Sequence, residues 1–359
     1  MAVTDAQVLN ALKSVQDPDL KRDIVSLGFV KDLRVNGGMV GFTIELTTPA
    51  CPVKELLKEE AQRAVQALPG VAQVDVTMTA QVRRSVSPEA GSLIPTVKNV
   101  IPIASGKGGV GKSTISANLA LALSQRGARV GLMDADVYGP SIPTLLGMTA
   151  EPQMDDHNRI TPVEQYGLKV MSMGFFMKPG EAIVWRGPML HKTVQQFLGG
   201  VLWGELDYLL VDLPPGTGDV QLSLCQSIPI TGAVIVSTPQ DVALNVAQKA
   251  VSMFGKLRVP VLGLLENMSY YVCPHCGQRD EIFGAGGGRR IAASLGIPLL
   301  GEIPLSTPVR VASDAGKPIV LADPGSPTAQ AFLRAAEQLA AQVSIRAMQG
   351  ELAQPRVTF

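Results

Sequence analysis

Two short segments of this 359-residue chain contain residue types at spacings that can do chemistry. The first is a glycine-rich run that fits the pattern G-x-x-x-x-G-K-S/T, namely Gly106, Lys107, Gly108, Gly109, Val110, Gly111, Lys112, Ser113 and Thr114. The second is the sequence Cys273-Pro274-His275-Cys276, in which two residues separate the thiols. The first pattern indicates phosphate binding, and the second indicates metal, cluster or redox chemistry.

The glycine-rich run has the sequence context of a phosphate-binding loop. It follows a predicted strand that ends at Ser105, and it opens a helix predicted over 115–124. The glycines let backbone N–H groups converge on phosphate oxygens, and the helix N-terminus adds partial positive charge. We expect Lys112 to contact the β- and γ-phosphates of ATP, Ser113 to bind Mg²⁺ and Thr114 to reach the α-phosphate.

A second lysine, Lys107, directly follows the first glycine, where it cannot easily fold back onto its own nucleotide. With this lysine the loop resembles the deviant Walker A loop of the MinD/ParA class of P-loop ATPases. The resemblance implies that Lys107 reaches the nucleotide of a partner subunit and that ATP promotes homodimerisation. Such a lysine would act like an arginine finger supplied in trans. The alternative is a solvated loop lysine.

Acidic residues at predicted strand ends would complete an ATP-hydrolysing site. Asp134 and Asp136 end one strand, at the edge where an open parallel sheet binds its ligand. We expect Asp136 to orient the attacking water or Mg²⁺ and Asp134 to hold the loop. Asp212 follows the apolar run 209–211, as in a Walker B segment, and is predicted to hold Mg²⁺ through water. Asn267, after a later strand, is predicted to recognise adenine through its amide.

The cysteine pair leaves three interpretations open: half of a zinc ribbon, a redox pair, or half of an iron–sulfur site. A complete zinc ribbon needs a second C-x-x-C, which the chain lacks, and a redox pair is expected beside a thioredoxin-like pattern. Two ligands cannot complete a four-thiolate site, but a two-fold axis near the turn brings in two more. Cys273 and Cys276 are therefore predicted ligands of a site shared by two copies of the chain, which zinc or a cluster can fill.

The other cysteines and a glycine cluster carry weaker signals. Cys51 precedes Pro52 at a predicted helix start, where the helix N-terminus would favour a thiolate, and a small buried residue is the alternative. Cys225 lies in an apolar helical stretch and is predicted to be inert. The glycines at 286–288 predict a hinge, with a cradle for an anion as the alternative.

The elements that must position these segments fall into two patterns. The first part of the chain predicts a small α+β domain, with helices at 5–15 and 53–68 and strands at 39–46 and 74–78. Later, short apolar strands alternate with helices, which predicts an α/β P-loop fold whose mainly parallel sheet is covered by helices on both faces. The strands are expected at 99–104, 128–133, 168–173, 208–211, 233–236 and 261–265. The predicted domains are 1–80, a linker at 81–96, the ATPase domain at 97–350 and a tail at 351–359.

Composition bears on partners and location. The chain has 31 Lys+Arg and 31 Asp+Glu, so its formal net charge is zero and nothing favours nucleic acid or an anionic membrane. The last predicted helix, 327–348, has only Arg334 and Arg346 as basic residues, which argues against membrane targeting. No apolar run approaches the roughly 18 residues of a membrane span, and the N-terminus lacks signal-peptide features, so we expect a cytoplasmic protein.

Taken whole, the chain resembles the Mrp/ApbC family of P-loop iron-sulfur cluster carriers, relatives of MinD. The resemblance rests on the segments 106–114, 134–140, 185–189, 212–219, 273–277 and 282–284. Residues 1–80 resemble the iron-sulfur-assembly domain fused to bacterial members, with 47–52 as its signature. The resemblance implies a homodimer that holds a [4Fe-4S] cluster between subunits, receives it from assembly scaffolds and transfers it to apo-proteins under ATP control. The rival hypothesis is a MinD/ParA-like spatial organiser on membrane or DNA.

Overall fold

The computed structural model describes residues 3–86, 92–177 and 187–353. The chain divides into two compact units, Met1–Arg83 and Arg84–Phe359. Each unit has its own sheet and its own buried apolar side chains.

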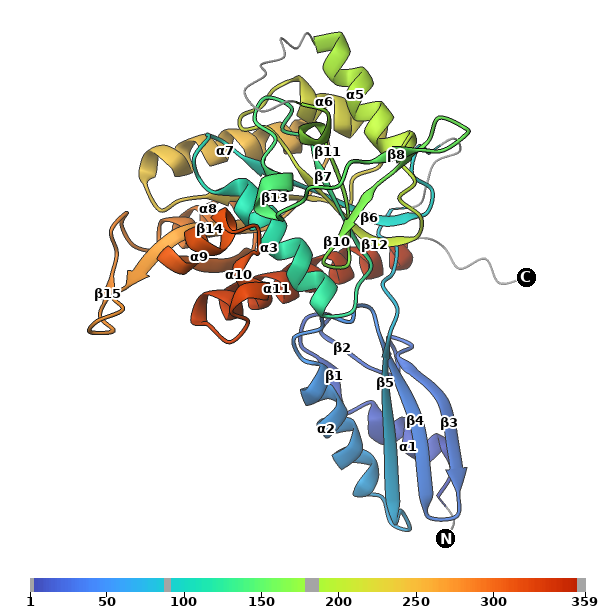
Figure 1. Ribbon diagram of the computed structural model, residues 1–359. Coiled ribbons are helices and arrows are strands. Elements are labelled where there is room, and N and C mark those ends of the chain that lie inside the picture. The colour runs from blue at the N-terminus through green and yellow to red at the C-terminus, as the bar shows by residue number, and fades with distance from the viewer. Residues whose placement is uncertain (1–2, 87–91, 178–186, 354–359) are drawn as a thin grey trace. The chain divides into compact units, whose positions relative to one another are not determined.

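The first unit is built on a three-stranded sheet in the order β3-β4-β5 (Figure 1). Strands β3 (Val30–Asn36) and β4 (Met39–Leu46) form an antiparallel hairpin, and β5 (Gln73–Ala80) pairs in parallel with β4 after the helix α2 (Lys54–Gln66). The alternation predicted at 39–46 is confirmed, because every second side chain of β4 is buried. The remaining elements are α1 (Asp5–Leu12), β1 (Gln16–Asp17) and β2 (Arg22–Asp23).

The start of α2 differs from the prediction. The helix begins at Lys54 with Val53 as its N-cap, so Cys51 is not the N-cap and Pro52 is not the first helical residue. The backbone N–H of Lys54 donates to the carbonyl oxygen of Cys51 at 3.4 Å, which closes a turn before the helix starts. The predicted N-cap at Cys51 and the predicted helix start at Pro52 are therefore wrong.

The second unit is built on a sheet that contains nine strands in the described part of the chain. Its path is β10-β11-β7-β12-β6-β13-β14-β15, with β16 also paired to β14, and its strands are parallel except for the pairings of β10 and β15. The bounds are β6 (Val97–Ser105), β7 (Val130–Asp134), β10 (Val163–Gln165), β11 (Leu168–Ser172), β12 (Leu206–Asp212), β13 (Ala233–Ser237), β14 (Val261–Val272), β15 (Arg279–Asp280) and β16 (Leu299–Leu305). The predicted α/β class is confirmed.

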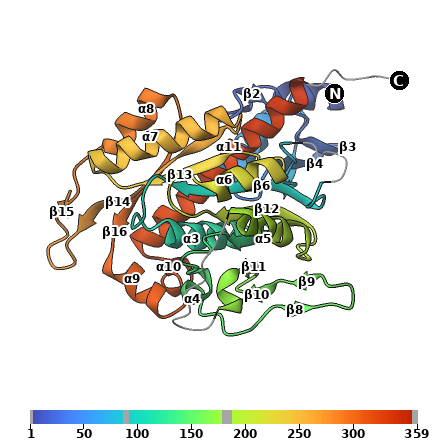
Figure 2. The ribbon, with the colours of Figure 1, turned by 90° about the horizontal axis from the view of Figure 1, so that it is seen from above.

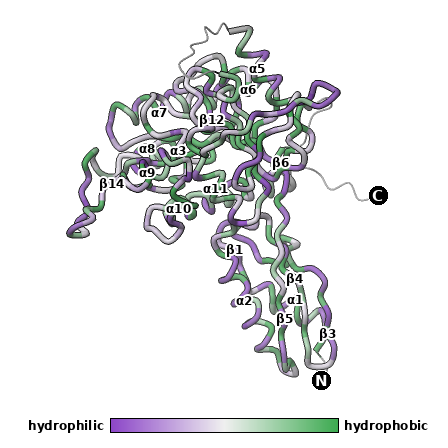
Figure 3. Tube along the Cα trace, viewed as in Figure 1, coloured by the Kyte–Doolittle hydropathy of each residue, from purple (hydrophilic) through white to green (hydrophobic). Residues whose placement is uncertain are grey.

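Helices cover both faces of this sheet. Helices α3 (Lys112–Gln125) and α11 (Pro327–Ala353) lie on one face, and α7 (Asp241–Lys256) and α8 (Gly287–Leu295) on the other (Figures 1 and 2). Strands between two helical layers are buried on both faces, which is why every residue of β12 is buried and its middle, 209–211, is apolar. Figure 3 shows the chain coloured by hydropathy, with hydrophobic residues in green. Smaller elements are α4 (Ile142–Leu145), β8 (Gln153–Met154), β9 (Ile160–Thr161), η1 (Met173–Phe176), α5 (Gly187–Gly199), α6 (Asp219–Ser227), α9 (Thr307–Asp314) and α10 (Ile319–Ala322).

Two boundary segments pack more closely than the sequence suggests. Within the stretch predicted as an exposed linker, Ile94 is buried, and the Ser85 hydroxyl donates to the side-chain oxygen of Asn99 at 2.8 Å. Asn99 belongs to β6, so the chain is held to the sheet of the second unit at Ser85. Helix α11 extends through Ala353, so part of the predicted tail is helical, and residues 354–359 lie outside the described residues.

Candidate functional site

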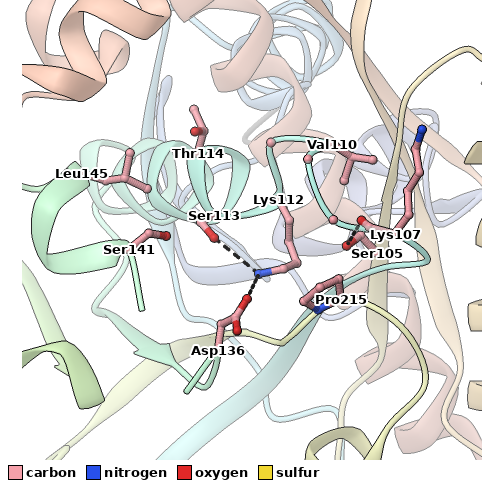
Figure 4. Close-up of a pocket in the computed structure, with 13 residues that line it drawn as sticks. Ser105, Lys107, Val110, Lys112, Ser113, Thr114, Asp136, Ser141, Leu145 and Pro215 are labelled. Atoms are coloured by element: carbon pink, nitrogen blue, oxygen red, sulfur yellow. Dashed lines mark hydrogen bonds and ion pairs between the residues drawn. The ribbon is translucent and has the colours of Figure 1, made fainter. Parts of the chain in front are cut away.

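The glycine-rich loop joins β6 to α3 at the carboxyl edge of the sheet. Gly109 and Gly111 have φ angles of +79° and +80°, in the left-handed region that favours glycine. Gly106 packs so closely that an added Cβ would lie 2.6 Å from the backbone of Val246. The loop encloses a cavity of about 300 Å³, whose wall includes Asp136 and Pro215 (Figure 4). The predicted loop residues Lys107 to Thr114 all line this cavity.

Lys112 connects the cavity to a buried carboxylate. Its ammonium lies 2.8 Å from Oδ2 of Asp212 and 3.9 Å from Oδ2 of Asp136. The Ser113 hydroxyl donates to the same Asp212 Oδ2 at 2.6 Å, and the Ser116 hydroxyl donates to Oδ1 at 2.6 Å. Asp212 is fully buried and does not line the cavity, whereas Lys112 and Ser113 do. The lysine therefore lies between the cavity and the carboxylate.

The two other predicted aspartates differ in burial. Asp134 is fully buried and accepts hydrogen bonds from the backbone N–H groups of Asp136 and Ile142 and from the Ser172 hydroxyl, at 3.1, 3.2 and 2.9 Å. Burial, with a further contribution from the charge of Asp212, raises the pKa of Asp134 to about 7. Burial also raises the pKa of Asp136, although the nearby Lys112 ammonium opposes this. Asp134 holds the chain after β7, and Asp136 faces the cavity.

Lys107 and Asn267 lie differently from the rest of the predicted set. In Figure 4 the Lys107 side chain extends away from Lys112 and Asp136. Its ammonium has no ion-pair partner among the residues that the structure describes. Asn267 is absent from the described cavity wall, and its side-chain amide donates to the carbonyl oxygen of Val110 at 2.8 Å. Its predicted adenine contact stays a prediction, and in this structure Asn267 holds the loop.

The cysteine pair lies on a turn that follows β14, at the same carboxyl edge of the sheet. The Cys273 N–H donates to the carbonyl oxygen of Gln278 at 3.0 Å, and the Gly277 N–H donates to that of Cys273 at 2.9 Å. Hydrogen bonds from the backbone N–H groups of His275 and Cys276, and from the Cys276 thiol, lower the pKa of Cys273. Cys276 is exposed and Cys273 half-buried. The described residues contain no cluster of three or more His, Cys, Asp or Glu side chains arranged to hold a metal.

Two buried polar residues in this region were not predicted. Ser116 lies within the apolar part of α3, and Glu266 interrupts the apolar run of β14. The Glu266 carboxylate accepts from the Ser269 hydroxyl at 2.6 Å and from the backbone N–H of Gly288 at the start of α8. The alternative prediction was that the glycines at 286–288 bind an anion, and in the structure the Glu266 carboxylate accepts from the backbone of one of them, Gly288. A single Glu between apolar strand residues was the signal that could have identified it.

The remaining sequence candidates have simpler placements. Cys225 packs against the apolar core, and burial raises the pKa of its thiol to about 11, in agreement with the predicted inert role. Arg186, in the 185–189 motif, lies outside the described residues. Among the helices that the structure describes, none combines the length and the apolar character that crossing a bilayer requires.

Two family models match the chain. Residues 96–340 match the model described as NUBPL iron-transfer P-loop NTPase, and residues 5–76 match the model described as iron-sulfur cluster assembly protein. The first match covers the nucleotide loop and the cysteine turn, and the second covers most of the first compact unit.

Close relatives are similar over almost the whole chain. A Synechocystis protein named iron-sulfur cluster carrier protein is 48% identical over 353 residues, which cover 97% of this chain and 100% of that protein. A Deinococcus radiodurans protein of the same name is 50% identical over 342 residues, which cover 95% and 96%.

Solved structures agree on the fold of the second unit. A nucleotide-binding protein from Archaeoglobus fulgidus, in complex with ADP, is 42% identical with a TM-score of 0.56, covering 62% of this chain and 88% of that one. The cell division ATPase MinD of Pyrococcus furiosus is 23% identical with a TM-score of 0.51, covering 67% and 97%, which is a likeness of fold alone.

Proposed function

The chain belongs to the iron-transfer P-loop NTPase family, and from that premise we propose that it is a cytoplasmic ATP-hydrolysing carrier of [4Fe-4S] clusters. The cluster is its cargo, received from assembly scaffolds and delivered to apo iron–sulfur proteins. The observation that supports the proposal is the presence, on one chain, of a glycine-rich loop whose Lys112 pairs with Asp212 at 2.8 Å and a cysteine turn that offers two thiols.

The nucleotide half of the proposal follows from the groups around the cavity. Lys112 is the cation that binds the β- and γ-phosphates, and the loop N–H groups cradle them. Asp136 is exposed to the cavity and is the group that orients the attacking water. The hydroxyl of Ser113 and the carboxylate of Asp212 are hard oxygen ligands that already meet at 2.6 Å, a donor set that fits Mg²⁺. When bound, Mg²⁺ neutralises charge on the phosphate oxygens.

A homodimer completes both halves. The Lys107 ammonium points away from its own Lys112 and is available to the nucleotide of a second subunit. The Cys273 and Cys276 thiolates of two copies together make the four ligands that a [4Fe-4S] cluster requires. The lowered pKa of Cys273 favours the thiolate, which is the ligating form. Exposure of Cys276 leaves a bound cluster accessible to the thiolates of a recipient.

The proposal is tested by anaerobic reconstitution with iron and sulfide. We expect the wild-type protein to take up about four irons and four sulfides per dimer and to become brown. The double variant Cys273→Ala/Cys276→Ala should lose this uptake, whereas Cys225→Ala, which removes a cysteine outside the turn, should retain it. Transfer is then measured as activation of an apo iron–sulfur enzyme, with and without ATP.

Three results would contradict the proposal. Full iron and sulfide uptake by the double variant would exclude the turn as the cluster site. Zinc as the metal of the anaerobically purified protein would favour a zinc-stabilised dimer. Co-sedimentation with anionic liposomes or DNA that depends on ATP, in a protein that transfers no cluster, would favour the spatial organiser.

A further inference from the structure

A buried hydroxyl holds the side of the Asp212 carboxylate that faces away from the cavity. Ser116 lies one helical turn after Lys112 on α3, and neither Ser116 nor Asp212 is exposed. The Ser116 Oγ lies 2.6 Å from Asp212 Oδ1 and 3.0 Å from the carbonyl oxygen of Lys112. A hydroxyl has one proton to donate, and the charged, nearer acceptor takes the larger share of it. The main partner of Ser116 is therefore the carboxylate.

The two oxygens of this carboxylate have partners of different kinds. Oδ2 accepts from the Lys112 ammonium and the Ser113 hydroxyl, at 2.8 and 2.6 Å, and both residues line the cavity. Oδ1 accepts from Ser116, which is fully buried and does not line the cavity. In the proposed function Lys112 also binds the phosphates, and Ser113 also binds Mg²⁺. Ser116 has no such competing partner.

We propose that Ser116 is a positioning residue for the magnesium-dependent step: it fixes Oδ1 of Asp212 so that Oδ2 stays directed at the cavity when Lys112 and Ser113 bind Mg·nucleotide. This inference rests on the proposed nucleotide function and deepens it. Without the Ser116 hydroxyl the carboxylate loses the donor that does not depend on the state of the cavity, and it can rotate about its Cβ–Cγ bond. The observations that carry the assignment are the split of donors between the two oxygens and the full burial of Ser116.

A purely structural serine would behave differently. Loss of a packing or folding contact lowers the melting temperature but leaves the response to Mg²⁺ unchanged. Loss of a positioning contact changes the magnesium dependence while the magnesium-free affinity for nucleotide stays the same, because Ser116 does not reach the cavity. Residues that orient a metal ligand typically change metal affinity or activity by about 10- to 100-fold.

The experiment is calorimetric titration of the full-length protein with ADP, with and without Mg²⁺. For Ser116→Ala we expect an approximately 10-fold loss of the gain in ADP affinity that Mg²⁺ provides. The magnesium-free affinity should stay within about two-fold of wild type, and kcat for ATP should fall more than KM rises. Ser116→Thr keeps a hydroxyl and should restore most of the magnesium response. Ser344→Ala is the matched control, because Ser344 is a buried serine whose hydroxyl has no hydrogen-bond partner in the described structure.

The outcomes separate this inference from the proposed function. If Mg²⁺ raises ADP affinity equally in wild type and Ser116→Ala, the positioning role is overturned while the nucleotide site stands. If Mg²⁺ has no effect on the wild-type protein, the assignment of Ser113 and Asp212 fails, and the inference fails with it. If the magnesium response is lost in Ser116→Ala but the wild type hydrolyses no ATP, the inference stands and the proposed hydrolysis is refuted.

Discussion

The nucleotide loop and the cysteine turn both lie at the carboxyl edge of the second unit's sheet, but they satisfy their functional groups in opposite ways. Around the loop, Lys112 and Asp212 are buried and paired with each other, because an unpaired charge in the interior is costly. On the turn, Cys273 is half-buried and Cys276 is exposed, and in the proposed function they supply two of the four ligands of a cluster. The Lys112–Asp212 pair is complete within one chain, whereas the turn contributes two thiols.

Because of this difference, mutations in the two regions should change different properties of the protein. The loop presents a fixed arrangement to a small ligand, so mutations there should change the rate of chemistry and little else. The turn is closed by short-range backbone hydrogen bonds, and in the proposed function its occupancy depends on a second subunit and on the recipient. If the two regions are independent, a mutation in the loop should leave cluster loading unchanged, and a mutation in the turn should leave ATP hydrolysis unchanged.

The largest effect is expected for Lys112→Ala. Lys112 pairs with Asp212 and, in the proposed function, binds the phosphates, so its removal should lower the rate of ATP hydrolysis by about 100-fold or more. Chemical loading of the cluster, measured as iron and sulfide per dimer, should be unchanged because Lys112 is not part of the turn. Lys256→Ala, at the exposed end of α7, removes a charge elsewhere and should hydrolyse ATP at the wild-type rate. Failure of Lys112→Ala to load a cluster would show that the regions are coupled.

The next largest effect is expected for the reactivity of two thiols, those of Cys273 and Cys225. The pKa of Cys273 is lowered from its ordinary value of 9.0, whereas burial raises that of Cys225 to about 11. A thiol forms its reactive thiolate as the pH rises through its pKa, so at pH 7 the thiolate fraction of Cys273 should exceed that of Cys225 by more than about 100-fold. Mass spectrometry of iodoacetamide labelling between pH 6 and 9 measures this. Equal labelling rates would contradict the hydrogen-bonded turn.

Glycine substitutions give a smaller effect and test packing in each region. A Cβ at Gly106 would lie 2.6 Å from the Val246 backbone, so Gly106→Ala should displace the loop and slow ATP hydrolysis by about 10-fold. Gly277 in the turn has a φ of +71° and open space around it, so Gly277→Ala should cost only about 1 kcal/mol of backbone strain. Gly255→Ala, in α7 with nothing nearby, should be neutral or slightly stabilising in thermal unfolding. A fully active Gly106→Ala would refute the close packing.

The sequence was informative where function depends on neighbours along the chain. The loop at 106–114, its preceding strand and its helix follow from local spacing, and so do the strand-end aspartates. The Ser116–Asp212 contact joins residues 96 positions apart, and the Asn267–Val110 contact joins residues 157 apart, so no local pattern indicates either. Such contacts are created by the order of strands in the sheet, which places β14 and β12 near β6.

Residue preferences alone predicted the wrong start for helix α2. The pair Cys51-Pro52 fits a helix N-terminus by residue preference, yet a turn intervenes and α2 begins at Lys54. Likewise, the glycines at 286–288 predict a flexible hinge, but Gly287 and Gly288 are the first residues of α8, and the backbone N–H of Gly288 donates to the buried Glu266 carboxylate. In both places a specific backbone hydrogen bond outweighs the general preference of the residue type.

The last contrast concerns Asp134, whose burial should make the free energy of unfolding depend on pH. Its pKa is about 7 in the folded protein and near 3.8 when unfolded, so the folded state binds the proton more tightly. The contribution of Asp134 is therefore complete below about pH 4 and is lost as the pH rises through 7. The neutral variant Asp134→Asn lacks this dependence, so its melting temperature should lie furthest below wild type at pH 5 and come closest at pH 8.

Asp155, which is only partly buried, provides the opposite case. Hydrogen bonds from Arg159 and His157 lower the pKa of Asp155, so its contribution is lost only as the pH falls through that lowered value. The difference in melting temperature between wild type and Asp155→Asn should accordingly stay constant from pH 5 to 8. A constant difference for Asp134→Asn as well would mean that Asp134 is already ionised at pH 5. The interior beside the loop would then hold a charged Asp134 in addition to the Lys112–Asp212 pair.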